Sequence, residues 1–429
     1  MSGQPGNGKP GLQARGRELM ASWKQFLAMT LIVYPVFISA EGWKNSVMSN
    51  PGARRPARAP QAMATSPKRA PGDVLPGRQE IFSILKKVNS YQVAHPMVDA
   101  WEAAHPEAGP ARRPWPRATW YTGVMAVWRA TRDPAFLEQA IDYGRLLHWG
   151  VGEEQLGANR LFPVEIWTEI YFAKKNRAMI EPGIKWLATP DPLTPAGQKR
   201  WYLDARDSFL EHPVPYIDST YGAAGLAMLA KATGDNKYLD IMRAFLDDVT
   251  GELLDKETGL FYRDTRFIGQ RDANGRKILW SRGNGWVFAG MARVLDYLPK
   301  NDPSRARYLS LFQRQAAALV ERQGADGLWR ANLDDPEQFS NPETSGTGFF
   351  CFGLAWGINH GVLNRTEYLP AVEKAWKGLT QSLSPEGKVL WGQIVDDRPH
   401  NVAQDNTHEY VTGTFLLAGS EVYKLTRKK

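Results

Sequence analysis

Two stretches of this chain combine residue types that can do chemistry, and the first centres on a carboxylate. Asp218 stands in the segment Val214–Tyr221, among apolar and aromatic residues. Partial burial there would favour the neutral carboxyl, which is the form that a general acid needs near neutral pH. Aspartate is also a preferred residue at helix starts, so a helix cap is the alternative role for Asp218.

The second stretch is Leu279–Val287, in which Arg282, Asn284 and two glycines lie between Trp280 and Trp286. Apolar residues at helical spacing follow, so the turn is expected at a helix N-terminus, where free backbone N–H groups favour an anion. A guanidinium suits a carboxylate, and tryptophan rings suit the face of a sugar. The stretch predicts one wall of a pocket for an acidic sugar. The alternative is a glycine-rich helix cap with two core tryptophans.

Three further residue types in the chain bear on ligands, metals and redox chemistry. Ser345 precedes an apolar run and suits either a ligand hydroxyl or a helix cap. His408 has no second histidine at metal-ligand spacing, so we expect no metal site there. Cys351 is the single cysteine, which excludes a disulfide within the chain. We expect neither a metal nor an organic cofactor.

Two kinds of turn recur along the chain and define the elements that must position these residues. In the first, a polar turn precedes an aromatic or apolar pair that opens a helix, as at Tyr238, Tyr308 and Tyr368. In the second, a glycine turn precedes aromatic residues, as at Gly259, Gly327 and Gly387, which follow those tyrosines by 21, 19 and 19 residues. An intervening helix of about 18 residues spans roughly 27 Å. The two kinds of turn therefore lie at opposite ends of the helices.

This alternation predicts an all-α fold in which about six helical hairpins close into an (α/α)6 barrel, with an open helical solenoid as the alternative. Strand content should be low. The helices are expected in pairs near 79–94 and 117–131, 134–149 and 164–175, 178–187 with 196–210 and 218–232, 236–251 and 284–298, 304–323 and 344–362, and 367–383 and 408–426.

The second helix of each pair begins at the rim of the glycine–aromatic turns. Polar and aromatic residues just before those helix starts should therefore surround one central cavity, which is the default binding site of such a fold. The segments concerned are Arg117–Tyr121, Arg160–Glu165, Tyr216–Asp218, Arg282–Trp286, Glu343–Ser345 and Thr407–Glu409.

The net charge of +8 comes from the N-terminal region. Residues 1–72 hold ten basic and two acidic residues, whereas the remainder holds 43 of each. The neutral remainder disfavours a nucleic-acid partner. Residues 26–40 form a mostly apolar run after Lys24, which predicts a signal peptide over 1–40 and a periplasmic or secreted protein without a stable membrane span in the mature chain; an uncleaved anchor is the alternative.

The composition of residues 41–77, rich in Pro, Ala and Arg, predicts a disordered linker before a single catalytic domain over 78–429.

Several motifs resemble those of the unsaturated glucuronyl and rhamnogalacturonyl hydrolases, glycoside hydrolase families 88 and 105. The likeness covers roughly residues 80–427, in the same order along the chain. The motifs are Trp280–Trp286, Gly259–Tyr262, Pro342–Gly346, Gly357–Gly361 and Phe415–Glu421. The resemblance implies an (α/α)6 barrel and an acidic oligosaccharide substrate that ends in a 4,5-unsaturated uronic acid.

By this resemblance, an aspartate donates a proton to the enol ether double bond and assists addition of water at C5, and the hemiketal then collapses and releases the sugar. Asp218 matches that aspartate, with Tyr216 in place of a family tryptophan. Arg282 and Trp286 match substrate-lining positions, and Trp120 lies where the family has an aromatic residue near the first inner helix.

Two positions depart from the family pattern. Arg160 stands where the family has a second aspartate, and Arg263 replaces a histidine that is common in one branch. Two added cations suit a further carboxylate or sulfate. We expect an exported hydrolase of unsaturated uronyl oligosaccharides; the alternatives are another carbohydrate-active α/α-barrel enzyme, either a glycosidase or an epimerase, and an inactive sugar-binding relative. The parent polysaccharide, the linkage and the oligomeric state remain open.

Overall fold

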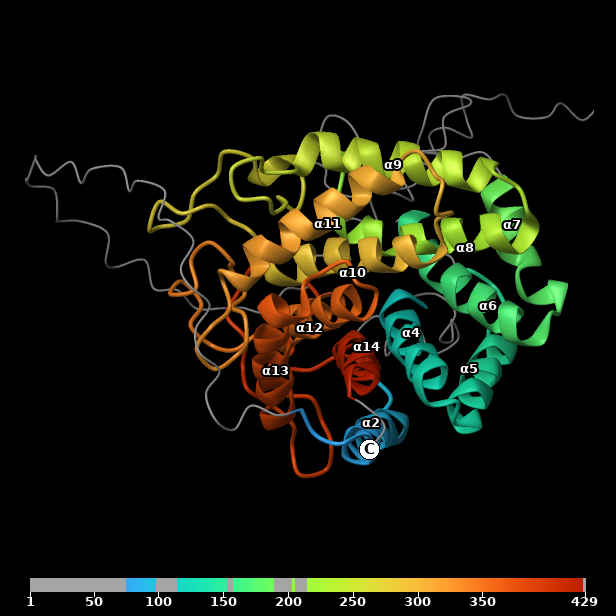
Figure 1. The fold of residues 1–429 in the computed structure, drawn as a ribbon, viewed down its shortest axis with the longest axis horizontal. Helices are drawn as coiled ribbons and strands as arrows, with labels where there is room; N and C mark the ends of the chain where they lie inside the picture. The colour runs from blue at the N-terminus through green and yellow to red at the C-terminus, as the bar shows by residue number, and fades with distance from the viewer. Residues whose placement is uncertain (1–74, 98–113, 153–156, 189–202, 205–213, 427–429) are drawn as a thin grey trace, which may run out of the picture. The chain divides into compact units, whose positions relative to one another are not determined.

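The computed structural model describes residues 75–97, 114–152, 157–188, 203–204 and 214–426. Its helices fall into an inner and an outer set (Figure 1). The inner helices are α4 (Pro114–Thr131), α6 (Leu161–Lys174), α8 (Ala223–Thr233), α10 (Ser281–Tyr297), α12 (Thr344–Asn359) and α14 (Glu409–Leu425). The outer helices are α2 (Arg78–Ala94), α5 (Pro134–Leu146), α7 (Glu181–Ala188), α9 (Lys237–Leu253), α11 (Arg305–Val320) and α13 (Arg365–Gln381).

The inner helices form a closed ring. Each packs against the next along the chain, from α4 through α6, α8, α10 and α12 to α14, and α14 packs back against α4. The contact between α14 and α4 is very close because glycines face each other: a Cβ on Gly413 would lie 2.3 Å from the carbonyl oxygen of Thr119, and one on Gly123 would lie 2.5 Å from that of Gly413. The ring confirms the predicted barrel.

Hydrophobic pattern distinguishes the two sets of helices. Residues 344–358 of α12 are all buried, because this helix has neighbours on every side. The outer helix α9 instead buries residues at helical spacing, including Tyr238, Met242, Phe245 and Val249, and exposes the opposite face. Outer and inner helices alternate along the chain in six pairs, which confirms the predicted pairs except for the segment 196–210 of the third pair.

Short elements connect the helices at the rims. They are η2 (Gly157–Arg160), η3 (Arg177–Met179), η4 (Ile217–Gly222), η5 (Thr265–Phe267) and the antiparallel strands β1 (Leu203–Asp204) and β2 (Val214–Pro215). The predicted helix 196–210 is wrong at residues 203–204, which pair with β2 instead. The rest of that prediction lies outside the described residues.

The loops before α10, α12 and α14 are joined by backbone hydrogen bonds at one end of the ring. Ser281 N donates to Ala331 O over 2.9 Å, Glu343 N donates to Trp329 O over 3.1 Å, and Thr344 N donates to Trp391 O over 2.9 Å. The inner helices α10 and α12 therefore begin at a common rim, as the turn pattern predicted.

The predicted signal peptide over 1–40 and nearly all of the predicted linker over 41–77 lie outside the described residues. Among the helices that the structure does describe, none combines the length and the apolar character needed to span a membrane.

Candidate active site

Asp218 is the second residue of η4, at the rim where the inner helices begin. Its side chain is 18% exposed, and its Oδ2 accepts a hydrogen bond from Arg263 Nε over 3.0 Å. The backbone of the same two segments is also joined, because Ile217 N donates to Arg263 O over 3.0 Å. The 3-10 helix has no side-chain cap. The carboxylate therefore forms an ion pair at this rim, and the N-cap residue of η4 is Tyr216 rather than Asp218.

Arg263 is held in place from several directions. It is 3% exposed, and its guanidinium lies 5.0 Å from the ring centroid of Tyr216. Its Nη1 donates to Asp264 Oδ2 over 2.7 Å. A planar guanidinium fixed by a ring and two carboxylates has little rotational freedom, so its position relative to Asp218 is defined.

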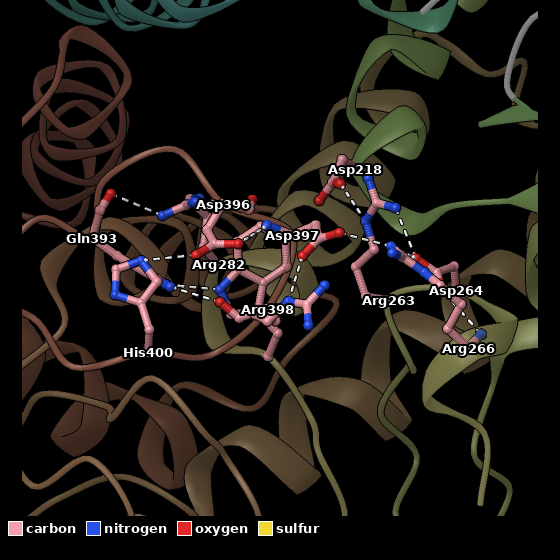
Figure 2. Close-up of polar contacts among 11 residues, drawn as sticks. Asp218, Arg263, Asp264, Arg266, Arg282, Gln393, Asp396, Asp397, Arg398 and His400 are labelled. Carbon is pink, nitrogen blue, oxygen red and sulfur yellow. Dashed lines mark hydrogen bonds and ion pairs between the residues drawn. The ribbon is translucent and has the colours of Figure 1, made fainter. Parts of the chain in front are cut away.

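Asp264 continues a chain of alternating charges that leads away from Asp218 (Figure 2). Its carboxylate is fully buried and accepts hydrogen bonds from Arg266 Nε over 2.9 Å and from Arg266 Nη2 over 2.7 Å. Arg266 Nη2 also donates to Asp397 Oδ2 over 2.7 Å, and Arg398 Nε donates to Asp397 Oδ1 over 2.8 Å. This series of ion pairs joins the segment after β2 to the segment before α14.

Hydrogen bonds from arginines decide the charge state of Asp264 and Asp397. Burial alone would raise the pKa of Asp264, but its bonds with Arg266 and Arg263 lower that pKa below its ordinary value. Burial likewise opposes ionisation of Asp397, yet the bonds from Arg398 and Arg266 hold its pKa well below the usual range. Both groups are therefore carboxylates at neutral pH.

Arg282 lies on the other side of the same rim and binds backbone. It is 1% exposed, and it donates to the carbonyl oxygens of Gln393 and Ile394 over 2.9 Å each and of Asp396 over 3.3 Å. Its guanidinium stands 4.5 Å from the ring centroid of Trp280. The sequence predicts that Arg282 binds the carboxylate of an acidic sugar; its hydrogen bonds in the described part of the chain go to backbone carbonyls. The charge of Arg282 is thus not neutralised by those partners.

Trp286 is the centre of an aromatic layer across the ring of inner helices. It is 2% exposed. Its ring lies 4.5 to 6.5 Å, between centroids, from one aromatic ring of each other inner helix or its first turn: Trp115, Phe162, Tyr221, Phe349 and Tyr410. Apart from the partly buried Trp115, these rings are buried, so the layer belongs to the core at the end of the ring that carries Asp218 and Arg282.

Asn284 and Ser345 are turned to neighbouring backbone and side chains. Asn284 Oδ1 accepts from Phe261 N over 2.9 Å, and its Nδ2 donates to the carbonyl oxygens of Phe261 and Trp280 over 3.0 Å each. Asn284 thereby fixes the segment that leads to Arg263. Ser345 Oγ donates to Glu343, whose carboxylate caps α12 through the N–H of Ser345 and of Gly346.

Trp120 and Arg160 complete the predicted set. The indole Nε1 of Trp120 donates to Asn89 Oδ1 over 2.9 Å, so this buried side chain is bound to the outer helix α2. Arg160 ends η2, an element that packs against η4 and so against the turn that carries Asp218. The structure thus brings Asp218 and Arg263 into contact, places Arg160 on a neighbouring turn, and binds Trp120 to the outer layer.

Sequence reasoning missed Asp264, Arg266, Asp397 and Gln393. Gln393 Oε1 accepts from the indole of Trp280 over 2.7 Å, and its carbonyl binds Arg282 and the Tyr410 hydroxyl. The available signal was the density of charged residues in segments 263–266 and 396–398 between helices. That signal marks loops, but it does not pair residues 131 positions apart.

Comparison with known proteins agrees with this architecture. The profile of Glycosyl Hydrolase Family 88 matches residues 83–426. The chain is 33% identical over 371 residues to an "Unsaturated 3S-rhamnoglycuronyl hydrolase" of Formosa agariphila, a match that covers 79% of this chain and 93% of the relative. It is 40% identical over 196 residues to a protein of the same name from an Alteromonas species, covering 46% of this chain and 48% of that one.

A solved structure of a family 88 glycosyl hydrolase from Bacteroides vulgatus superimposes with a TM-score of 0.69 at 27% identity, covering 81% of this chain and 99% of the other. The family profile spans the whole described ring of helices and the rim that carries Asp218, Arg263 and Arg282. The chain therefore belongs to glycosyl hydrolase family 88 and is a glycoside hydrolase.

Proposed function

We propose that this enzyme releases a terminal 4,5-unsaturated uronic acid from lyase-generated acidic oligosaccharides by hydrating the enol ether double bond. The observation that carries the proposal is the Asp218–Arg263 pair, with Oδ2 and Nε 3.0 Å apart, at the rim above the aromatic layer. A carboxyl group that is partly exposed at such a rim is accessible to a bound sugar. The names of the Formosa and Alteromonas relatives support an unsaturated uronyl substrate.

In the proposed reaction, Asp218 acts on the double bond and on water. Its carboxyl proton is added to C4, and the oxygen of a water molecule forms a bond to C5 while that water returns a proton to the Asp218 carboxylate. The net change is addition of one water across C4=C5. The resulting hemiketal opens by breaking the bond between C5 and the ring oxygen, with the C5 hydroxyl proton passing to that oxygen, which becomes a hydroxyl on C1. The hemiacetal at C1 then breaks its bond to the glycosidic oxygen, which takes the proton of that hydroxyl and departs with the leaving sugar as C1 becomes an aldehyde. Asp218 is thereby regenerated as the acid.

The substrate carboxylate needs a cation that is not already neutralised. Arg282 meets this need, because its described hydrogen bonds go to three carbonyl oxygens and it is held between Trp280 and Tyr410, whose ring centroids lie 4.5 and 5.0 Å from its guanidinium. A buried guanidinium without a carboxylate partner attracts an anion strongly.

The cations Arg160 and Arg263 favour a substrate with a second anionic group. We propose a sulfated rhamnose as the sugar that leaves, in line with the "3S-rhamnoglycuronyl" in the names of two relatives. Arg160, on the turn next to η4, is the candidate for contact with that sulfate. Export to the periplasm or beyond accords with polysaccharide degradation and is part of this proposal.

The experiment is turnover of paired unsaturated disaccharides, with and without sulfate on the rhamnose, followed by loss of the ultraviolet absorbance of the double bond. We expect kcat/KM to be at least about tenfold higher for the sulfated member, because one charge-assisted contact is worth about that factor. Equal turnover of the two disaccharides would reject the proposed sulfate specificity but would leave the proposed hydrolase reaction standing. No turnover of either substrate, with binding retained, would reject the hydrolase and favour an inactive sugar-binding relative.

A further inference from the structure

A pocket lies at the opposite end of the inner helices from Asp218. It has a volume of about 470 Å³ and is formed by the C-terminal ends of α4, α6 and α10 with part of α5. Its lining comprises Trp128, Arg129, Arg132, Leu137, Glu169, Phe172, Ala173, Lys174 and Tyr297. Because α10 has 17 residues, a helix length of roughly 25 Å separates this pocket from the catalytic rim.

The base of the pocket holds a buried acid, Glu169, in contact with Arg129, whose side chain is 22% exposed. Glu169 is 3% exposed, and its Oε1 pairs with Arg129 over 3.1 Å and accepts from Arg293 over 3.2 Å. Glu169 Oε2 and Arg129 Nε are buried and find no hydrogen-bond partner within the described chain. Buried polar atoms of this kind are rare, and each calls for a partner. Both residues line the pocket, where a carboxylate can accept from a sugar hydroxyl and a guanidinium can donate to one.

The mouth of the pocket carries two more cations. Arg132 lies with its guanidinium 5.0 Å from the ring centroid of Trp128, which holds the fork in one plane. Arg132 follows α4 with a left-handed backbone, at φ +63°. At the corresponding end of α8 this conformation is taken by a glycine, Gly234, at φ +77°. Lys174 lies across the mouth, where it also pairs with Glu138 over 3.3 Å.

The composition of the lining indicates the class of ligand. Three cationic side chains face one acidic side chain, and three aromatic residues provide apolar walls. The volume lies in the range of pockets that hold small ligands. Aromatic walls accept the apolar face of a sugar, the base accepts hydroxyl groups, and the cations at the mouth accept a carboxylate or a sulfate.

We propose that this pocket, defined by Arg129, Arg132, Glu169 and Lys174, is a second carbohydrate site that binds one anionic sugar unit without catalysis. Such a site would keep the enzyme on an acidic polysaccharide or its fragments while the catalytic rim acts on a free end. Only the choice of probe below rests on the proposed function.

Calorimetric titration of the full chain carrying Asp218→Asn tests the proposal. The probe is the disaccharide of an unsaturated uronate on 3-sulfated rhamnose. We expect two sites, of which one is weakened at least about tenfold by the added pair Arg132→Ala and Lys174→Ala, since two charged contacts are lost. These side chains lie at the mouth, so the variant should keep the parental unfolding midpoint. Arg145→Ala is the matched control, because Arg145 is 66% exposed and does not line the pocket.

Neutral rhamnose and sodium sulfate serve as comparison ligands. Both should bind this pocket more weakly than the disaccharide, because rhamnose lacks the anionic group and sodium sulfate lacks the sugar ring and its hydroxyl groups. Two sites that are unaffected by the paired variant would overturn the proposal, as would sodium sulfate binding as tightly as the disaccharide. If the catalytic assignment alone is wrong, a single site remains and is still weakened by Arg132→Ala and Lys174→Ala.

Discussion

Arg263 Nε lies 3.0 Å from Asp218 Oδ2, and this contact joins the proposed acid to a residue 45 positions later in the chain. An adjacent guanidinium favours the ionised carboxylate, whereas proton donation to a double bond needs the protonated form. The proposed reaction therefore places its acid beside a cation, so Arg263 is expected to influence when Asp218 can donate a proton. An anionic substrate shifts this balance, because its charge competes for Arg263 and disfavours a second anion nearby.

Replacing Arg263 should change the pH profile of the enzyme. In Arg263→Gln the cation 3.0 Å from Asp218 is lost, so the basic limb of kcat/KM should move to higher pH. The measurement is kcat/KM across pH 5 to 9 for both proteins. Lys237→Gln, which removes a surface ion pair with Asp235, is the control and should keep the wild-type limb. An unshifted basic limb in Arg263→Gln would show that Arg263 does not influence the pH dependence of catalysis.

Asp264 should be essential to stability, because it holds two arginines in a buried setting. Asp264→Asn removes a fully buried carboxylate and leaves Arg263 without one of its two acidic partners. Breaking a buried ion pair from one side costs about 3 to 5 kcal/mol. Chemical denaturation should show a loss of that order in the free energy of unfolding. The control Asp142→Asn breaks an exposed pair with Arg145 and should cost less than about 1 kcal/mol.

The close packing of α4 against α14 should be sensitive to a single methyl group. A Cβ on Gly413 would meet the carbonyl oxygen of Thr119 at 2.3 Å, so Gly413→Ala forces the two helices apart. We expect a loss of about 1 to 3 kcal/mol, seen as a lower Tm. Gly251→Ala in α9 is the matched control: a Cβ there meets nothing within 4 Å. That change should raise the Tm, because alanine favours a helix by up to about 1 kcal/mol. Equal changes in Tm for Gly413→Ala and Gly251→Ala would contradict the described packing of α4 against α14.

Glu165 should make stability depend on pH. It is fully buried in α6, and burial raises its pKa to about 7, although the nearby Arg293 opposes the rise. The folded state therefore binds this proton more tightly than the unfolded chain. The resulting stabilisation is complete below pH about 4.5 and is lost as the pH rises to about 7. Thermal unfolding between pH 5 and 8 should show this decline in wild type, and Glu165→Gln should flatten it. An unchanged slope in Glu165→Gln would refute the assignment.

Sequence reasoning reached the barrel because the signal is repeated. Helices that are apolar all round, such as α12, alternate with amphipathic ones, such as α9, and each pair repeats the same two turns. Local pattern sufficed for the barrel. It also marked Asp218 as a carboxylate among aromatic residues, but with a helix cap as an equal alternative, so the catalytic role rests on the family resemblance and stays a prediction.

Other features depend on contacts that no local pattern encodes. The bond from Arg266 to Asp397 joins residues 131 positions apart, and the partners of Arg282 are backbone carbonyls of residues 393, 394 and 396. Helix propensity also failed at Leu203–Asp204, where pairing with Val214–Pro215 replaces a helical turn. In each case tertiary contact decided the outcome.

The most direct test of the account is the rate at which Asp218→Asn consumes an unsaturated uronyl disaccharide, followed by loss of double-bond absorbance. Asparagine keeps the shape of the side chain but cannot donate and recover the proton. The account predicts that kcat falls by at least about a hundredfold, with the disaccharide still bound and with Asp142→Asn at the wild-type rate. Turnover by Asp218→Asn at the wild-type rate would contradict the central claim.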